Sequence, residues 1–270
     1  MKQYKHVVQD AGLRSNLDQL ILRSKKGFPN IIVVFGPTRA GKTTSTCQNA
    51  YYVATGLNMP FTNDNIFFNS DMCLREAKKG TKHGVYVMDE AAFDLMGEDW
   101  KNKADDQINF LKMIMTAAMF AQTFFICIPK LEKLREYIVT DDHARGLEIY
   151  YNQKTYEKGY FKGYNRSSLI FKWVLLRMRK YSDAQKVNCQ FRGRFHKDMS
   201  FIDTKQYQKD KEAAIQQIGE NQKKGSDLWK SRYLDLAGHM RKQGAKLKDI
   251  ASLSEGVHPN ALSRDLKQTT

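Results

Sequence analysis

The sequence has little of what membrane proteins, disulfide-rich proteins and metal-cluster proteins need. No run approaches the roughly 18 apolar residues of a membrane-spanning helix, and the N-terminal residues carry charges where a signal peptide would be apolar. No CxxC pair occurs, and no histidine lies at metal-ligand spacing from the four cysteines, Cys47, Cys73, Cys127 and Cys189. These absences predict a cytoplasmic protein with reduced, buried thiols and no membrane span.

Acidic residues are scarce in the second part of the chain. Residues 1–150 contain 19 Lys and Arg against 17 Asp and Glu, whereas residues 151–270 contain 25 against 12. Of the net charge of +15, +13 therefore lies beyond residue 150. Localised positive charge attracts polyanions, and nucleic acid is the commonest of these inside cells. We expect a nucleic acid partner, with DNA favoured; a generally solubilising basic surface is the alternative.

Apolar runs alternate with helical patterns between residues 30 and 151. The run NIIVVFG is β-branched and fully apolar, which is typical of a central parallel strand. Strands that alternate with helices indicate right-handed crossovers and a mostly parallel sheet. The pattern thus predicts a doubly wound α/β domain with further strands at residues 65–70, 84–90, 124–129 and 146–151.

A glycine-rich loop follows the first predicted strand and precedes a predicted helix. Its glycines let backbone amides point at phosphate groups, Lys42 reaches the β- and γ-phosphates, and the Thr43 hydroxyl binds Mg²⁺. We interpret the loop and the next residue as the binding site for ATP and Mg²⁺. The residues that match GxxxxGK[ST] are Gly36, Pro37, Thr38, Arg39, Ala40, Gly41, Lys42 and Thr43. Thr44 is the next residue and completes the predicted site.

Two acidic residues end the third predicted strand, VYVMDE. Asp89 is expected to hold Mg²⁺ through water, and Glu90 to orient and deprotonate the attacking water. A solvated strand end is the plainer alternative, but two carboxylates there are costly without a cation or a proton to accept. Since one strand lies between the phosphate loop and this acidic pair, the order resembles that of additional-strand, catalytic-glutamate P-loop ATPases.

A narrower resemblance rests on GPTRAGKTT, on GVYVMDEAAF and on FFICIPKLEKLREYI followed by DDHARGLEIYY. Over about residues 30–151 the chain resembles the HerA/FtsK-type DNA-pumping ATPases, including the zonular-occludens-toxin-like and viral genome-packaging branches. The resemblance implies a RecA-like P-loop core with strand order 5-1-4-3-2, a homo-oligomer for which a ring is one form, and a viral or mobile-element origin. Localisation would then be host cytoplasm or the virion.

The chain departs from that family where γ-phosphate sensing is expected. The fourth predicted strand runs into Pro129 and Lys130 in place of a polar sensor, which leaves Lys130 or Gln122 as weak substitutes. An arginine acting on the nucleotide of a neighbouring subunit would be Arg135 or Arg145, and we favour Arg145. A surface role for Arg145 is the alternative.

Two basic regions offer contacts for DNA. As a strand, residues 190–196 would place Arg192 and Arg194 on one face and aromatic side chains on the other, which suits either phosphate contact or protection of a sheet edge. Residues 228–270 have the spacing of a helix-turn-helix, which suits DNA contact or protein docking. There the residues expected to face DNA are Asn260, Ser263, Arg264 and Lys267.

Together these features predict four parts of the chain. They are an N-terminal helical segment at 1–29, an ATPase domain at 30–204 with a basic aromatic extension from about 152, a charged linker at 205–227, and a helical module at 228–270. The expected function is an oligomeric ATPase that translocates or packages DNA. A non-motor DNA-associated switch, of the helicase-loader or transposition-accessory type, is the runner-up. A small-molecule kinase is disfavoured by the acidic pair and the basic tail.

Overall fold

The computed structural model describes residues 7–89, 112, 115–216, 233–234, 236–237, 240, 246 and 248–249. The chain forms two compact units, Met1–Lys211 and Glu212–Thr270. The boundary falls inside the segment predicted as a charged linker. Among the described residues, no helix has the length and apolar content needed to cross a membrane.

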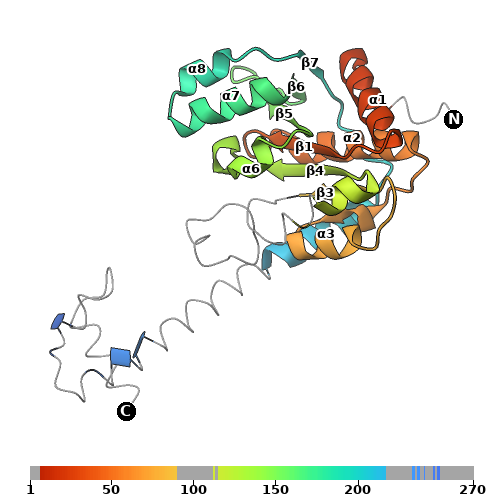
Figure 1. The fold of residues 1–270 in the computed structure, drawn as a ribbon. Helices are drawn as coiled ribbons and strands as arrows, with labels where there is room; N and C mark the ends of the chain where they lie inside the picture. The colour runs from red at the N-terminus through yellow and green to blue at the C-terminus, as the bar shows by residue number, and fades with distance from the viewer. Residues whose placement is uncertain are drawn as a thin grey trace. The chain divides into compact units, whose positions relative to one another are not determined.

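The described strands of the first unit form one sheet of seven, in the order β2-β3-β4-β1-β5-β6-β7 (Figure 1). β1 to β5 are parallel, and β6 and β7 are antiparallel additions. The α/β class with a mostly parallel sheet is confirmed. The strand order differs from the predicted order of five strands, because β6 and β7 extend the sheet beyond β5. The strands are β1 (Asn30–Phe35), β2 (Ile66–Phe67), β3 (Val85–Met88), β4 (Thr123–Ile128), β5 (Ala144–Tyr150), β6 (Tyr160–Tyr164) and β7 (Phe191–Arg194).

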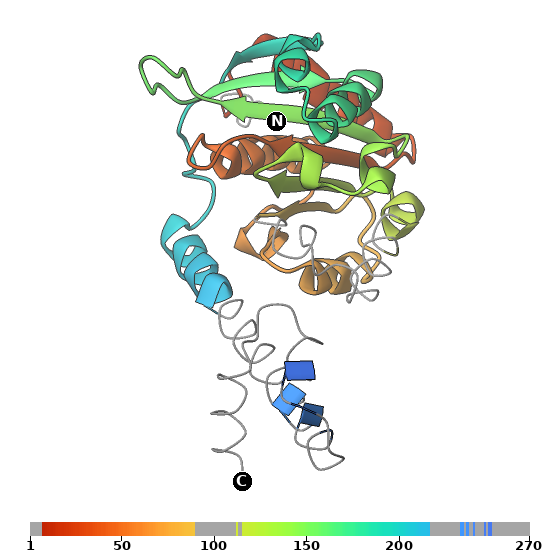
Figure 2. The ribbon, with the colours of Figure 1, turned by 90° about the vertical axis from the view of Figure 1, so that its left-hand side faces the viewer.

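Helices cover both faces of this sheet (Figures 1 and 2). α1 and α2 pack on one face, and α3, α6 and α7 pack on the other, as the two separate clusters of buried apolar side chains show. The bounds are α1 (Ala11–Lys25), α2 (Lys42–Gly56), α3 (Ser70–Ala77), α6 (Glu136–Val139), α7 (Arg166–Arg177) and α8 (Tyr181–Lys186), with short 3-10 helices η2 (Asn63–Asn65) and η4 (Leu131–Lys133). Residues 115–120 and 204–216 are also helical.

The central strands are buried on both sides, which explains their unbroken apolar sequence. All six residues of β1 and all six of β4 are buried. A strand between two helical layers has no solvent face, so it lacks polar alternation. By contrast, β7 alternates between half-buried and exposed residues, since it lies at the edge of the sheet.

One predicted helix is interrupted. LEKLREYI was expected to be a single helix, but Leu134 and Arg135 have extended backbones between η4 and α6. The Leu134 side chain is buried, and its carbonyl oxygen accepts a hydrogen bond from Trp173 Nε1 at 3.0 Å. Tertiary contacts of one leucine therefore override the local helical pattern.

The cysteines are all free thiols, as predicted, but they differ in burial. Cys47, Cys73 and Cys127 are buried, whereas Cys189 is half-buried. Burial raises the pKa of the Cys73 thiol well above its usual value. The three buried thiols thus behave as small apolar side chains.

Candidate functional site

The loop between β1 and α2 bends sharply. Gly36, Arg39 and Gly41 have φ angles of +137°, +64° and +101°, values that glycine adopts most easily. A Cβ atom at Gly36 would overlap the carbonyl oxygen of Ile149 in β5. Position 36 therefore requires glycine, because the loop begins against the backbone of the neighbouring strand.

Two residues at the start of α2 carry the chemistry of the loop. Lys42 folds back, and its Nζ donates to the carbonyl oxygens of Gly36 at 2.9 Å and Pro37 at 3.0 Å. Thr43 points the other way, and its hydroxyl donates to Asp89 Oδ1 at 3.0 Å. The loop thus brings a cation and a hydroxyl to the carboxyl end of the sheet, while the exposed Pro37, Thr38 and Arg39 form its outer turn.

Asp89 lies directly after β3 and is 2 % exposed. Its backbone NH donates to the Phe67 carbonyl at 2.8 Å, which fixes the end of β3 beside β2. Burial raises the pKa of the Cys47 thiol, and the charge of Asp89 raises it further. Because so little of Asp89 is exposed, its carboxylate lies in a poorly solvated place, where a charge requires hydrogen bonds or a cation.

Sequence reasoning missed two residues of this site. The hydroxyl of Tyr207 donates to Asp89 Oδ2 at 2.5 Å, and Lys211 Nζ lies 3.0 Å from the same oxygen. Tyr207 is buried, so the prediction of an exposed segment beginning at residue 205 was wrong at this position. Burial and the Asp89 charge raise the pKa of Tyr207, so its hydroxyl keeps the proton that it donates. The available signal in the sequence was a tyrosine and a lysine four residues apart, a spacing that places both on one face of a helix.

The oxygen atoms of Thr43 and Asp89 fit a magnesium ion. Mg²⁺ prefers hard oxygen ligands and usually takes one or two carboxylates together with substrate phosphates and water. Within the described part of the chain, no group of three or more His, Cys, Asp or Glu side chains could hold a metal alone. Thr43 and Asp89 would thus supply two of the oxygen ligands that Mg²⁺ prefers.

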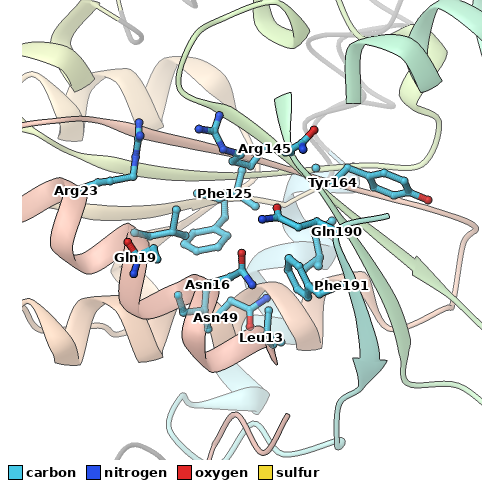
Figure 3. Close-up of a pocket in the computed structure, with 16 residues that line it drawn as sticks. Leu13, Asn16, Gln19, Arg23, Asn49, Phe125, Arg145, Tyr164, Gln190 and Phe191 are labelled. Carbon is cyan, nitrogen blue, oxygen red and sulfur yellow. The ribbon is translucent and has the colours of Figure 1, made fainter. Parts of the chain in front are cut away.

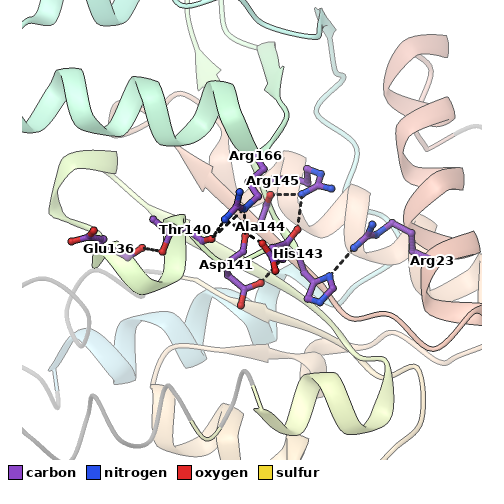
Figure 4. A network of polar contacts seen from close by, with 9 residues as sticks. Arg23, Glu136, Thr140, Asp141, His143, Ala144, Arg145 and Arg166 are labelled. Carbon is purple, nitrogen blue, oxygen red and sulfur yellow. Dashed lines mark hydrogen bonds and ion pairs between the residues drawn. The ribbon is translucent and has the colours of Figure 1, made fainter.

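Arg145 lies at the other end of the sheet. It pairs with Ile32 near the start of β1, whereas the phosphate loop begins after Phe35. Its Nη1 donates to the carbonyl oxygens of Ala144 at 2.6 Å and Asp142 at 3.3 Å (Figure 4). Burial lowers the pKa of Arg145, and nearby Arg23 and Arg166 lower it further. Arg145 is therefore remote from the loop of its own chain.

The proposed sensor substitutes differ in position as well. Gln122 precedes β4 at the amino end, where its Nε2 donates to the Ala77 carbonyl at 3.0 Å, and it is therefore a structural residue. Lys130 follows β4 at the carboxyl end. Of the two, only Lys130 lies at the edge that carries the phosphate loop.

The predicted DNA contacts divide into three groups. Arg192 is exposed on β7. Arg194 forms an ion pair with Glu157, and its guanidinium lies 4.7 Å from the ring centre of Tyr160. The other four residues expected to face DNA lie outside the described residues; they are Asn260, Ser263, Arg264 and Lys267.

Glu90, which was predicted to deprotonate the attacking water, also lies outside the described residues.

Two cavities lie near these elements. One, of about 290 Å³, lies between α1 and the sheet, with Asn16, Gln190 and Phe191 around it (Figure 3). Asn49 also lines it, and its buried Nδ2 has no hydrogen-bond partner. The second, of about 370 Å³, is lined by Tyr156, Phe195 and neighbouring residues.

Phe195 contacts both the second cavity and the loop between β1 and α2. A Cβ atom at Gly41 would lie 3.0 Å from Phe195 Cζ, and Phe195 lines that cavity. No residue of the loop itself lines either cavity.

Comparisons of the chain with protein-family models, with curated proteins and with solved structures found no match.

Proposed function

We propose that this chain is a P-loop ATPase that binds ATP with Mg²⁺ and hydrolyses it. The observation that carries the proposal is the contact between Thr43 and Asp89 at 3.0 Å. It joins the glycine loop after β1 to the acidic end of β3, two segments 46 residues apart in sequence. Such a pairing of hydroxyl and carboxylate beside a phosphate loop is how P-loop enzymes hold Mg²⁺.

Each side chain at the proposed site would have a separate role in binding or hydrolysis. Bound Mg²⁺ would neutralise charge on the β- and γ-phosphates. Thr43 and Asp89 would hold that ion, and Lys42 would exchange its two carbonyl partners for phosphate oxygens. Glu90 follows Asp89 in the sequence and would take a proton from the attacking water.

Two variants separate binding from chemistry. Lys42→Ala removes a charge-assisted contact to phosphate, so affinity for a fluorescent ATP analogue should fall by roughly 100-fold. Glu90→Gln keeps the size of the side chain but cannot accept a proton, so ATP should still bind while single-turnover hydrolysis slows by on the order of 100-fold. Normal binding by the Lys42 variant would refute the nucleotide site. Normal hydrolysis by the Glu90 variant would refute the base.

The same proposal extends to DNA. The excess of positive charge beyond residue 150 and the resemblance to HerA/FtsK-type ATPases support an oligomeric DNA translocase or packaging ATPase. Affinity for DNA should then fall steeply as salt rises, because bound phosphates release counterions. Native mass measurement with nucleotide and DNA tests the motor: a closed ring around DNA supports it, whereas a monomer or dimer on DNA does not.

A non-motor switch is the second candidate. The favouring observation is that Asp89 contacts Lys211, the last residue before the C-terminal unit. In a switch, nucleotide occupancy would change how the C-terminal unit binds DNA, with no movement along it. DNA affinity that depends on nucleotide, without translocation of a labelled duplex, would favour this candidate.

A further inference from the structure

Tyr207 and Lys211 converge on one oxygen of the proposed metal site. They lie four residues apart in the helical stretch 204–216 and so share a face of the helix. Tyr207 donates to Asp89 Oδ2 at 2.5 Å, and Lys211 Nζ lies 3.0 Å from that oxygen. The Lys211 side chain is 20 % exposed, so its ammonium group lies between the buried carboxylate and solvent.

This helix is fixed to the P-loop domain at its first turn. Asp203 Oδ1 accepts from the backbone NH of Gln206 at 3.0 Å, which caps the helix. Asn63 exchanges two hydrogen bonds with the Asp203 backbone, at 2.8 and 3.2 Å. The ring centres of Tyr207 and Phe68 lie 5.6 Å apart. Tyr207 is therefore held by several contacts on the domain, whereas Lys211 lies one turn beyond them.

A metal ion at Asp89 would compete with Lys211 for the same carboxylate. A buried carboxylate is costly without a cation, and Lys211 supplies one. A divalent ion bound between Thr43 and Asp89 would supply a larger charge at the same carboxylate. Two cations beside one oxygen repel each other in a poorly solvated place, so metal binding must move the Lys211 ammonium away from Oδ2.

We propose that Lys211 is a positioning residue that competes with Mg²⁺ for Asp89, while Tyr207 orients the carboxylate in both states. Without Mg²⁺–nucleotide, Lys211 neutralises Asp89 from within the helical stretch 204–216. With it, the Lys211 side chain leaves Oδ2, and the helical stretch beyond Tyr207 loses this contact with the domain. Because Glu212 begins the C-terminal unit, metal occupancy would change the chain at the point where that unit begins. This inference rests on the proposed nucleotide site.

The two side chains should shift the Mg²⁺ requirement in opposite directions. Binding of a fluorescent, non-hydrolysable ATP analogue to the full chain would be measured as Mg²⁺ is titrated. Lys211→Met removes the competitor, so half-maximal binding should need roughly 5-fold less Mg²⁺ or lower. Tyr207→Phe leaves Asp89 less well oriented, so more Mg²⁺ should be needed. A purely structural role would weaken binding in both variants.

Matched controls separate charge from position. Lys209→Met removes the same charge from an exposed position on the same helix and should leave the Mg²⁺ requirement unchanged. Lys211→Arg keeps a cation beside Asp89 and should restore a requirement close to that of the unaltered chain. A Lys211→Met variant that matches Lys209→Met would overturn the competition.

Hydrogen exchange of the unaltered chain tests the release of Lys211 without any substitution. Peptides covering residues 208–216 should exchange faster with Mg²⁺ and the analogue than with the analogue and a chelator, because that part of the helical stretch loses its contact with Asp89. Equal exchange in the two conditions would overturn the release of Lys211. If the chain binds the analogue in neither condition, the proposed function itself fails, which these measurements distinguish from failure of the competition alone.

Discussion

The two ends of the parallel strands hold charge in different ways. At the carboxyl end, the buried Asp89 carboxylate is held by side chains from remote segments, Thr43, Tyr207 and Lys211. At the amino end, arginines are held largely by backbone carbonyls, as where Arg166 Nη2 donates to the Thr140 carbonyl at 2.6 Å (Figure 4).

The difference lies in what can be exchanged. A backbone carbonyl is fixed by the fold, so an arginine bound to it stabilises one arrangement of the chain. A side-chain hydroxyl or ammonium can rotate away when a competing ligand arrives. The arginine contacts at the amino end therefore stabilise the fold, and the carboxyl end is the one that we propose for binding. The following experiments test this contrast.

Glycine substitutions at the two ends should have the most unequal effects on stability. Gly36→Ala strains a residue with φ of +137° and brings its Cβ against the Ile149 carbonyl, so unfolding free energy should fall by about 3 kcal/mol. Gly27→Ala at the amino end should lower the unfolding free energy by only about 1 kcal/mol, because the residue has a φ of +89° but no described atom lies near the added Cβ. Denaturant unfolding measures both, and equal losses would contradict the close approach of the loop to β5.

Aspartate substitutions at the two ends should differ in their effect on the Mg²⁺ needed for nucleotide binding. Asp89→Asn removes the charge beside the proposed Mg²⁺, so the Mg²⁺ needed for half-maximal nucleotide binding should rise by roughly 10-fold. Asp142→Asn at the amino end removes an exposed partner of Arg166 and should leave the requirement unchanged. A rise in both variants would indicate a general effect of charge.

Acidification should act on the amino end through two histidines. Burial lowers the pKa of His83 and of His143 from the usual 6.5. Arg23 Nη2 lies 2.9 Å from His143 Nδ1, and since arginine only donates, that ring is neutral in the fold.

The stability gained from neutral rings is complete above pH 6.5 and is lost as the pH falls toward the lowered values. The thermal midpoint should therefore drop modestly between pH 7.5 and 5.5. His143→Gln, which cannot be protonated, should show a shallower drop. An equal drop of the thermal midpoint in the variant would show that His143 does not contribute to this pH dependence.

Arg145→Ala should have the smallest effect. Because Arg145 lies at the amino end and donates to backbone carbonyls, nucleotide affinity of the isolated chain should not change measurably. Equilibrium binding at low protein concentration provides the measurement. Weaker nucleotide binding by this variant at low protein concentration would contradict the separation of the two ends. A loss confined to turnover in an assembled oligomer would instead support action on a neighbouring subunit.

The sequence predicted the parts of the site whose pattern is local. The proposed phosphate loop is a continuous stretch between a strand and a helix, so its residues could be named from their spacing. Asp89 could be named because it ends an apolar strand. The parallel sheet followed from the same alternation of strands and helices.

Other parts depend on contacts that no local pattern records. Tyr207 approaches Asp89 from 118 residues away, within a stretch that looks like a solvated linker. The placement of β7 depends on pairing with β6, where Gly163 leaves room for the Phe191 ring. Arg145 was predicted to act on the nucleotide of a neighbouring subunit, and its position in β5, at the opposite end of the sheet from the loop of its own chain, does not test that prediction.

The distance between Asp89 and its partners along the chain also sets the order in which the site is made. Tyr207 and Lys211 follow Asp89 by 118 and 122 residues. At about 5–20 residues per second, the ribosome adds them roughly 10 s after Asp89. Until then the nascent domain has its phosphate loop and its carboxylate but not the tyrosine or the lysine. The site is therefore completed late in synthesis, after β6 and β7 have already been made.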